Sequence, residues 1–178
     1  MKFEIEHCWT GEIIFEIEIG TLRLAVEAAV KSGANLSGAN LYGADLSGAS
    51  GVNRYRSTPL MMLLDQPGKI RAYKLVKKDG LAPFNGGITY EVGKSYEVAD
   101  ANTNETESCA AGINVASLDW CIRSWQEGWR ILVVEFTAKD IAAIPNATDG
   151  KFRLFRATVV GEKDLREIGV IKAEEKVS

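Results

Sequence analysis

The chain has only one histidine and three scattered cysteines, and this shortage limits the metal and catalytic sites that it can build. His7 is the only histidine among 178 residues, and Cys8, Cys109 and Cys121 lie far apart. A single histidine excludes the zinc sites that use two, and any Ser-His-Asp mechanism would depend on a residue in the first strand. The odd number of distant cysteines argues against a disulfide framework. We therefore expect no metal site and no cofactor, and we expect Cys109 and Cys121 to be buried small hydrophobic residues.

Long apolar runs and a strong charge imbalance are also missing. No run approaches the roughly 18 apolar residues that a membrane span needs, and residues 1–6 lack the apolar core of a signal peptide. A net charge of −3 argues against a dedicated nucleic-acid-binding protein, which is usually basic. The glycines fit neither a P-loop nor a dinucleotide fingerprint. We expect a cytoplasmic protein with no membrane partner and no sequence-specific nucleic-acid partner.

Residues 33–51 form a five-residue repeat, the most regular segment of the chain. They read Gly-Ala-Asn-Leu-Ser, Gly-Ala-Asn-Leu-Tyr, Gly-Ala-Asp-Leu-Ser and Gly-Ala-Ser-Gly. Helices and strands, with periods of about 3.6 and 2, do not return a side chain to one face every five residues. A coil that turns a corner every five residues would instead point Leu36, Leu41 and Leu46 inward.

This pattern resembles the pentapeptide-repeat family, whose right-handed β-solenoid takes four repeats per rung. The chain therefore holds about one rung. Repeat units bury their apolar faces by stacking on neighbours, and a single unit is not enough. We expect the rung to dock on another part of the protein.

Alternating side chains predict a β-hairpin before the repeat. Apolar residues and glutamates alternate over residues 2–19, with a turn at Trp9-Thr10-Gly11 between the two strands. Thr21 can cap a helix whose apolar side chains share one face and which ends at Gly33. We expect this helix to plug the end of the rung.

The remainder of the chain predicts a mixed α+β domain with a mostly antiparallel sheet and one main helix. Strands are expected at residues 70–76, 88–91, 95–98, 130–136, 141–144 and 152–160. The continuous apolar run of the 130–136 strand is typical of a central position, and the helix is expected to begin at Ser117 and to end at Gly128.

These predictions divide the chain into four parts. Residues 1–51 form the hairpin, the helix and the rung; residues 52–69 form a connector; and residues 70–171 form the α+β domain. Residues 172–178 are a charged tail that we expect to be disordered. The acidic segment 100–107 is expected to be a long polar loop.

Several short motifs of the second half are similar to one uncharacterised family. They are Ala-Tyr-Lys-Leu at 72–75, Tyr-Glu-Val-Gly-Lys at 90–94, Cys-Ala-Ala-Gly-Ile-Asn-Val at 109–115, Asp119-Trp120 and Thr-Asp-Gly-Lys-Phe-Arg at 148–153. They resemble a domain of unknown function that is common in tailed phages and prophages and often follows pentapeptide repeats. The resemblance covers nearly the whole chain and implies a phage accessory protein in the cytoplasm of the infected bacterium. It implies no activity, and many relatives have His at the position of Asn114.

Basic and aromatic residues favour a pocket for a phosphorylated or nucleotide-derived ligand. Cationic side chains suited to phosphates gather in residues 52–78 and near residue 153. Stacking surfaces for a base would come from Tyr55, Tyr73, Phe84, Tyr90, Trp120, Trp125 and Trp129. Without an evident catalytic base, this set indicates a receptor more than an enzyme, such as a protein that sequesters a host defence signal. The expected lining residues are Arg71, Tyr73, Lys74, Asn114, Lys151 and Arg153.

Two other functions stay open. Tyr73 and Lys74 on a strand, with an acidic residue such as Glu135 or Glu107, loosely resemble the layout of ADP-ribosyltransferase-like folds. That resemblance implies an enzyme, possibly degenerate, that binds nicotinamide dinucleotide. Such enzymes bind it through an Arg or His on an early strand, and this chain has Lys74 at that place. The third function is a structural or protein-interaction module. Because the two faces of a single rung are unpaired backbone, we expect stacking on another copy and a homo-oligomer.

Overall fold

The computed structural model describes residues 1–36, 39–41, 46, 55, 58–84 and 87–171. The chain divides into two compact units: residues 1–61, 104–108 and 145–149 form the first, and residues 62–103, 109–144 and 150–178 form the second. The expected tail at 172–178 lies outside the described residues, as do residues 52–54 and 56–57 of the expected connector. None of the described helices is both long enough and apolar enough to cross a membrane.

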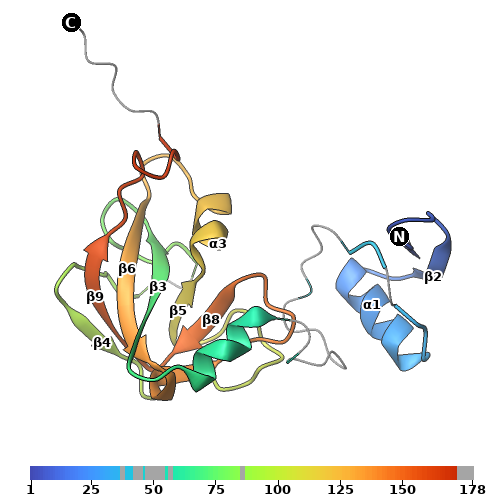
Figure 1. Cartoon of the computed structure of the whole chain (residues 1–178), viewed down its shortest axis with the longest axis horizontal. Coiled ribbons are helices and arrows are strands. Elements are labelled where there is room, and N and C mark those ends of the chain that lie inside the picture. Colours follow the sequence, from blue (N-terminus) through green and yellow to red (C-terminus); the bar gives the residue numbers. More distant parts are fainter. Residues whose placement is uncertain (37–38, 42–45, 47–54, 56–57, 85–86, 172–178) are drawn as a thin grey trace, which may run out of the picture. The chain divides into compact units, whose positions relative to one another are not determined.

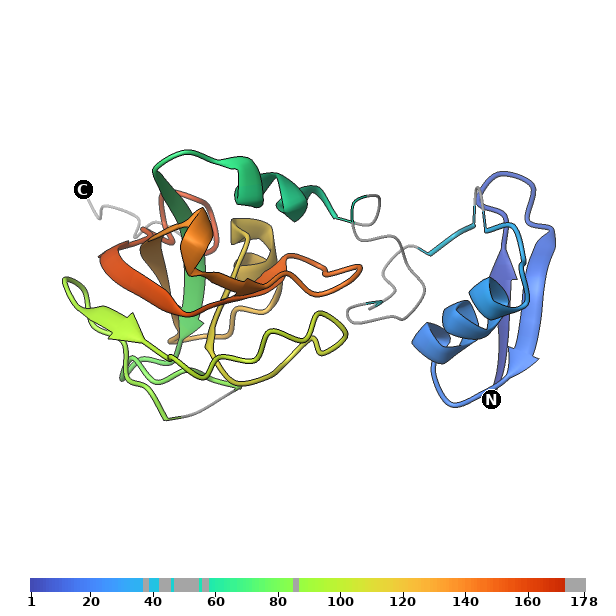
Figure 2. The ribbon, with the colours of Figure 1, turned by 90° about the horizontal axis from the view of Figure 1, so that it is seen from below.

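The first unit begins with an antiparallel hairpin and a helix packed beside it (Figure 2). Strand β1 spans Lys2–Glu6, β2 spans Ile13–Glu18, and helix α1 spans Leu22–Lys31. The Oγ1 of Thr21 accepts a hydrogen bond of 3.3 Å from the main-chain N of Leu24, which satisfies one of the free donors at the helix start. Gly33, at φ +78°, follows the helix in a conformation that suits glycine. The predicted hairpin, cap and helix are confirmed.

The leucines of the repeat pack on this hairpin and helix. Ile5, Val26 and Ala29 form a small buried core. Packed against that core are the partly buried side chains of Phe15, Leu22, Ala34, Leu36, Ala39, Leu41 and Leu46. The five-residue spacing therefore does direct the leucines to one apolar side, and the expectation that the repeat docks elsewhere in the chain is confirmed. Most other repeat positions lie outside the described residues, so the solenoid form of the rung stays a prediction.

The second unit is built on a seven-stranded sheet in the order β4-β9-β6-β3-β5-β8-β7 (Figure 1). Every neighbouring pair is antiparallel. The strands are β3 Lys69–Val76, β4 Ser95–Glu97, β5 Ile113–Ala116, β6 Arg130–Thr137, β7 Ile141–Ala143, β8 Lys151–Leu154 and β9 Arg156–Glu162. The described helical segments of this unit are the short helix α3, Leu118–Arg123, and the 3₁₀ turn η2, Ala138–Asp140. A further 3₁₀ turn, η1, spans Pro59–Asp65, so its first three residues are assigned to the first unit and the others to the second. This arrangement confirms an α+β fold with a mostly antiparallel sheet.

The sheet is strongly curled without being closed. Phe155 alone joins β8 to β9, yet β5, β3 and β6 lie between these strands in the sheet. In a flat sheet the two would be about 19 Å apart, at about 4.8 Å per strand, whereas two Cα steps reach only about 7 Å. The rings of Phe136 on β6 and Phe152 on β8 lie 5.6 Å apart, which is a contact across the inside of the curl. Within the described residues, β4 and β7 do not pair.

Three predicted elements differ from the structure. The expected strand 152–160 is two strands, because the chain crosses between distant parts of the sheet at Phe155, whose N donates to the main-chain O of Asp140. The expected strand 88–91 is only an isolated bridge between Leu81 and Thr89. The helix α3 ends at Arg123, before Gly128. In addition, residues 113–116, for which no strand was predicted, form β5.

Candidate functional site

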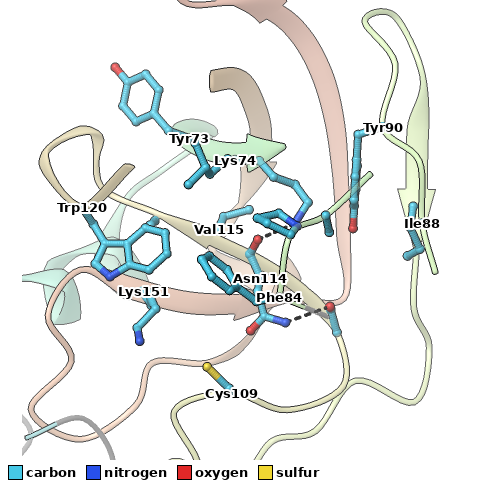
Figure 3. Close-up of a pocket in the computed structure, with 15 residues that line it drawn as sticks. Tyr73, Lys74, Phe84, Ile88, Tyr90, Cys109, Asn114, Val115, Trp120 and Lys151 are labelled. Carbon is cyan, nitrogen blue, oxygen red and sulfur yellow. Dashed lines mark hydrogen bonds between the residues drawn. The ribbon is translucent and has the colours of Figure 1, made fainter. Parts of the chain in front are cut away.

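A small cavity in the second unit lies over the junction of β3 and β5 (Figure 3). These strands share only one paired position, Tyr73 with Ala116, before they part. The cavity has a volume of about 70 Å³, enough for roughly five water molecules. It can therefore enclose a phosphate, a carboxylate, a carbonyl or part of a ring, and the rest of any larger ligand would lie at its mouth.

Lys74 is the charged group inside this cavity. Its side chain points from β3 to the inside of the curled sheet, on the same face as Ala72 and opposite Leu132 of β6. Its Nζ donates a hydrogen bond of 2.7 Å to the main-chain O of Asn114 and lies 4.4 Å from the centre of the Tyr90 ring. No carboxylate in the described part of the chain pairs with it. Burial therefore lowers the pKa of Lys74 to about 8.

Tyr90 is held over Lys74 by a close backbone contact with Gly80. Gly80 has φ +86°, and a Cβ on it would lie only 2.7 Å from the main-chain O of Tyr90. The main-chain N of Tyr90 donates to the O of Gly80 at 2.9 Å. Burial raises the pKa of Tyr90, so its hydroxyl stays protonated at neutral pH. The ring is thus fixed as a neutral, electron-rich surface beside the ammonium.

Aromatic side chains and a second lysine form the mouth of the cavity. Phe84 is 60% exposed, and its ring makes edge contacts with Trp120 at 6.1 Å and Trp129 at 6.0 Å. The Nζ of Lys151 lies 5.4 Å from the centre of the Trp120 ring. Gly150 places Lys151 there, because a Cβ on Gly150 would meet the Oγ of Ser117 at 2.4 Å, at the start of α3. The mouth therefore combines an ammonium with flat rings.

Asn114 and Cys109 complete the polar lining. The Nδ2 of Asn114 donates to the main-chain O of Ala110 at 3.0 Å and to that of Gly112 at 3.2 Å. These two acceptors fix the orientation of the amide and leave Oδ1 as the atom that can accept from a ligand. Cys109 is exposed, so the prediction that it is buried was wrong, whereas Cys121 is fully buried as predicted.

The structure brings four of the six predicted lining residues together and separates the other two. Tyr73, Lys74, Asn114 and Lys151 line the cavity. Arg71 does not, because its guanidinium lies at the exposed end of β3 and pairs with Glu135 at 2.8 Å. Arg153 is fully buried, and its Nε donates to the main-chain O of Asn102 at 3.0 Å. It therefore makes contacts in the protein interior and does not line the cavity.

Three aromatic residues outside the predicted lining also line the cavity. They are Phe84, Tyr90 and Trp120, which the sequence indicates only as possible stacking surfaces. Gly80 is the one residue whose type could have indicated such a contact, because a glycine in a turn often marks a close approach of two backbones. Its presence does not say which aromatic ring the approach would place over Lys74.

Glu135, the acid considered for an ADP-ribosyltransferase-like site, lies in a different hollow. It lines an open groove of about 590 Å³ along β4, β9 and β6. Hydrogen bonds from Arg71 and then Lys69 lower the pKa of Glu135. The same groove holds Asp140, whose burial would raise its pKa, but hydrogen bonds from Thr137 and Arg156 outweigh burial and lower it. Lys74 and Glu135 thus do not share a site.

Comparison with known proteins identifies one short segment. The family model for pentapeptide repeats (8 copies) matches residues 32–50. Neither the curated proteins nor the solved structures gave a match to the chain. The chain is therefore an α+β protein with a short pentapeptide-repeat segment in its first unit. The cavity belongs to the second unit, which the match does not reach.

Proposed function

We propose that the second unit is a ligand-binding domain whose cavity takes a small anionic molecule, either phosphorylated or derived from a nucleotide. The observation that carries this proposal is the composition of the lining. Two ammonium groups, Lys74 and Lys151, face the cavity, and no Asp or Glu stands among its described lining residues. An anion entering this site meets attraction from both lysines and no repulsion from a carboxylate of the lining.

The shape of the site supports a ligand with a charged group and a flat part. The enclosed space of about 70 Å³ is below the roughly 300 Å³ of pockets that enclose a whole drug-sized ligand. A nucleotide-sized molecule would therefore place one group inside, near Lys74, and stack the remainder against Phe84 and Trp120 at the mouth. Lys151 lies at this mouth, where it can meet a phosphate or a carboxylate.

The biological setting of this function stays a prediction. A phage accessory role, capture of a host defence signal, location in the bacterial cytoplasm and self-association through the faces of the rung are all expectations from the sequence. Sedimentation of the purified chain tests the last of these, and a monomer over a wide range of concentration would refute it. The ligand proposal does not depend on the outcome.

A binding screen tests the ligand proposal. Inorganic phosphate, nucleoside monophosphates and cyclic nucleotides are titrated into the full chain by calorimetry, with uncharged nucleosides as a comparison. Binding of at least one anion is expected, and Lys151→Met is expected to weaken it by about tenfold, the value of one charge-assisted hydrogen bond. Lys78→Met, at an exposed lysine outside the cavity lining, is the matched control. No binding by any anion, or equal losses in both variants, would refute the proposal.

A further inference from the structure

Lys74 differs from the other lysines of the structure in its surroundings. It is the only lysine among the described residues that is buried, with 4% of its surface exposed. A buried ammonium is normally paired with a carboxylate, because the loss of hydration is costly. Lys74 has instead a carbonyl oxygen and an aromatic ring, both of which tolerate an ammonium but neither of which carries a negative charge.

The geometry leaves the amine open to the cavity. The Nζ is anchored by one hydrogen bond, to the main-chain O of Asn114, and Tyr90 covers one side of it (Figure 3). Lys74 also lines the cavity. A neutral amine can keep donating one N–H to the Asn114 carbonyl while its lone pair points elsewhere. The cavity is the space into which that lone pair can react.

We propose that Lys74 captures its ligand covalently, and that the cavity takes an anionic aldehyde or ketone whose carbonyl carbon forms an imine with the Nζ of Lys74. The inference rests on the proposed function in one respect, because the anionic group of the same molecule would use Lys151 at the mouth. It adds the chemical class of the ligand, a carbonyl compound, and the residue to which it becomes attached.

The reaction needs no oxidant, reductant or further reactant. The lone pair of neutral Nζ attacks the carbonyl carbon, a C–N bond forms, and one amine proton moves to the former carbonyl oxygen. The resulting carbinolamine loses that oxygen as water, and the C=N bond forms with loss of the second amine proton. The sum is amine plus carbonyl giving imine plus water, and it is reversible.

The protonation state of Lys74 favours this reaction. Its pKa of about 8 leaves about a quarter of the amine neutral near pH 7.5, against about one part in a thousand for an exposed lysine. The neighbouring thiol does not compete, because burial raises the pKa of Cys121 to about 12. Cys109, which is exposed and lines the cavity, can add reversibly to an aldehyde, but borohydride does not convert that adduct into a stable one.

Pyridoxal 5′-phosphate is a suitable probe, because it carries an aldehyde, a flat ring and a phosphate. The full chain is incubated with a small excess of it, reduced with borohydride and mapped by peptide mass spectrometry. Lys74 is expected to be labelled at least tenfold faster than any exposed lysine, with a rate that rises with pH to a midpoint near 8. Labelling spread over exposed lysines, with Lys74 unmodified, would overturn the inference. Because the mapping uses the unaltered chain, it does not depend on how a variant folds.

A second ligand separates this inference from the proposed function. Pyridoxine 5′-phosphate has the same ring and phosphate but an alcohol in place of the aldehyde. If it binds at the site while the aldehyde leaves Lys74 unlabelled, the imine is refuted and the anion site stands. If the aldehyde labels Lys74 selectively while pyridoxine 5′-phosphate does not bind, the imine stands and the preference for an anion is refuted. Lys74→Met should abolish the selective label, and Lys78→Met should leave it unchanged.

Discussion

The ammonium of Lys74 lies 4.4 Å from the centre of the Tyr90 ring, inside a β-sheet protein where no carboxylate of the described chain pairs with it. The ring and one carbonyl oxygen therefore provide the electrostatic compensation for this buried charge. Such an arrangement is costly for folding and useful for chemistry, because it yields a lysine that loses its proton readily.

Lys74→Met should make the stability of the protein less dependent on pH in the alkaline range. The folded pKa is about 8 and the ordinary value is 10.5, so the unfolded chain binds more protons between these values. The free energy of unfolding of the wild type therefore rises with pH in this window. Relative to the variant, the wild type should gain on the order of 2 kcal/mol between about pH 7 and pH 9.5. Urea unfolding at several pH values measures this difference, and parallel curves would contradict it.

Gly80→Ala should destabilise the second unit more than Gly93→Ala does. Both glycines have a positive φ, +86° and +84°, so alanine is strained at either position. At Gly80 the new Cβ would also lie 2.7 Å from the main-chain O of Tyr90, whereas at Gly93 nothing lies within 4 Å. We expect a cost of about 1 kcal/mol at Gly93 and about 1 to 3 kcal/mol more at Gly80. Equal losses in denaturant unfolding would show that the contact does not hold Tyr90 in place.

The docking of the repeat can be tested at Leu41. Leu41→Ala removes a partly buried side chain that packs on the core of Ile5, Val26 and Ala29. We expect about 1 to 2 kcal/mol of local destabilisation, because the site is only half buried and can partly collapse. Hydrogen exchange of the α1 amides measures the effect where it arises. Leu24→Ala, at a helix residue that is 37% exposed, is the control and should change exchange little.

The sequence predicted the elements whose signals are local. Thr21 is the cap of α1, as expected from a threonine just before an apolar helical face. The leucines of the repeat lie on one apolar side, as expected from their five-residue spacing. The hairpin shows where alternation stops being a guide. A register shift after Ile5 leaves Ile13, one of the alternating apolar residues, 51% exposed. A bulge depends on how two strands pair, and strict alternation in one strand does not reveal it.

The candidate site was predictable in part for the same reason. Lys74 and Tyr73 are adjacent on one strand, so their proximity is given by the chain itself. Tyr90, Phe84 and Trp120 reach the cavity from a loop and from α3, and that meeting depends on the curl of the sheet. Arg71 was misplaced because its side chain lies on the face of β3 opposite to that of Lys74, where it pairs with Glu135.

Glu135→Gln should leave the cavity unaffected, which separates the binding proposal from the ADP-ribosyltransferase-like alternative. Glu135 lies in the open groove with Lys69 and Arg71, and its pKa is lowered by its hydrogen bonds with them. The stabilisation from these pairs is present above the usual pKa of a glutamate and is lost as the pH falls through the lower folded value. The variant should therefore lose stability less steeply in acid, while anion affinity and the selective labelling of Lys74 stay as in the wild type. If instead the variant abolishes ligand binding at neutral pH while remaining folded, Glu135 belongs to the binding site, and the assignment of the two hollows to separate roles is wrong.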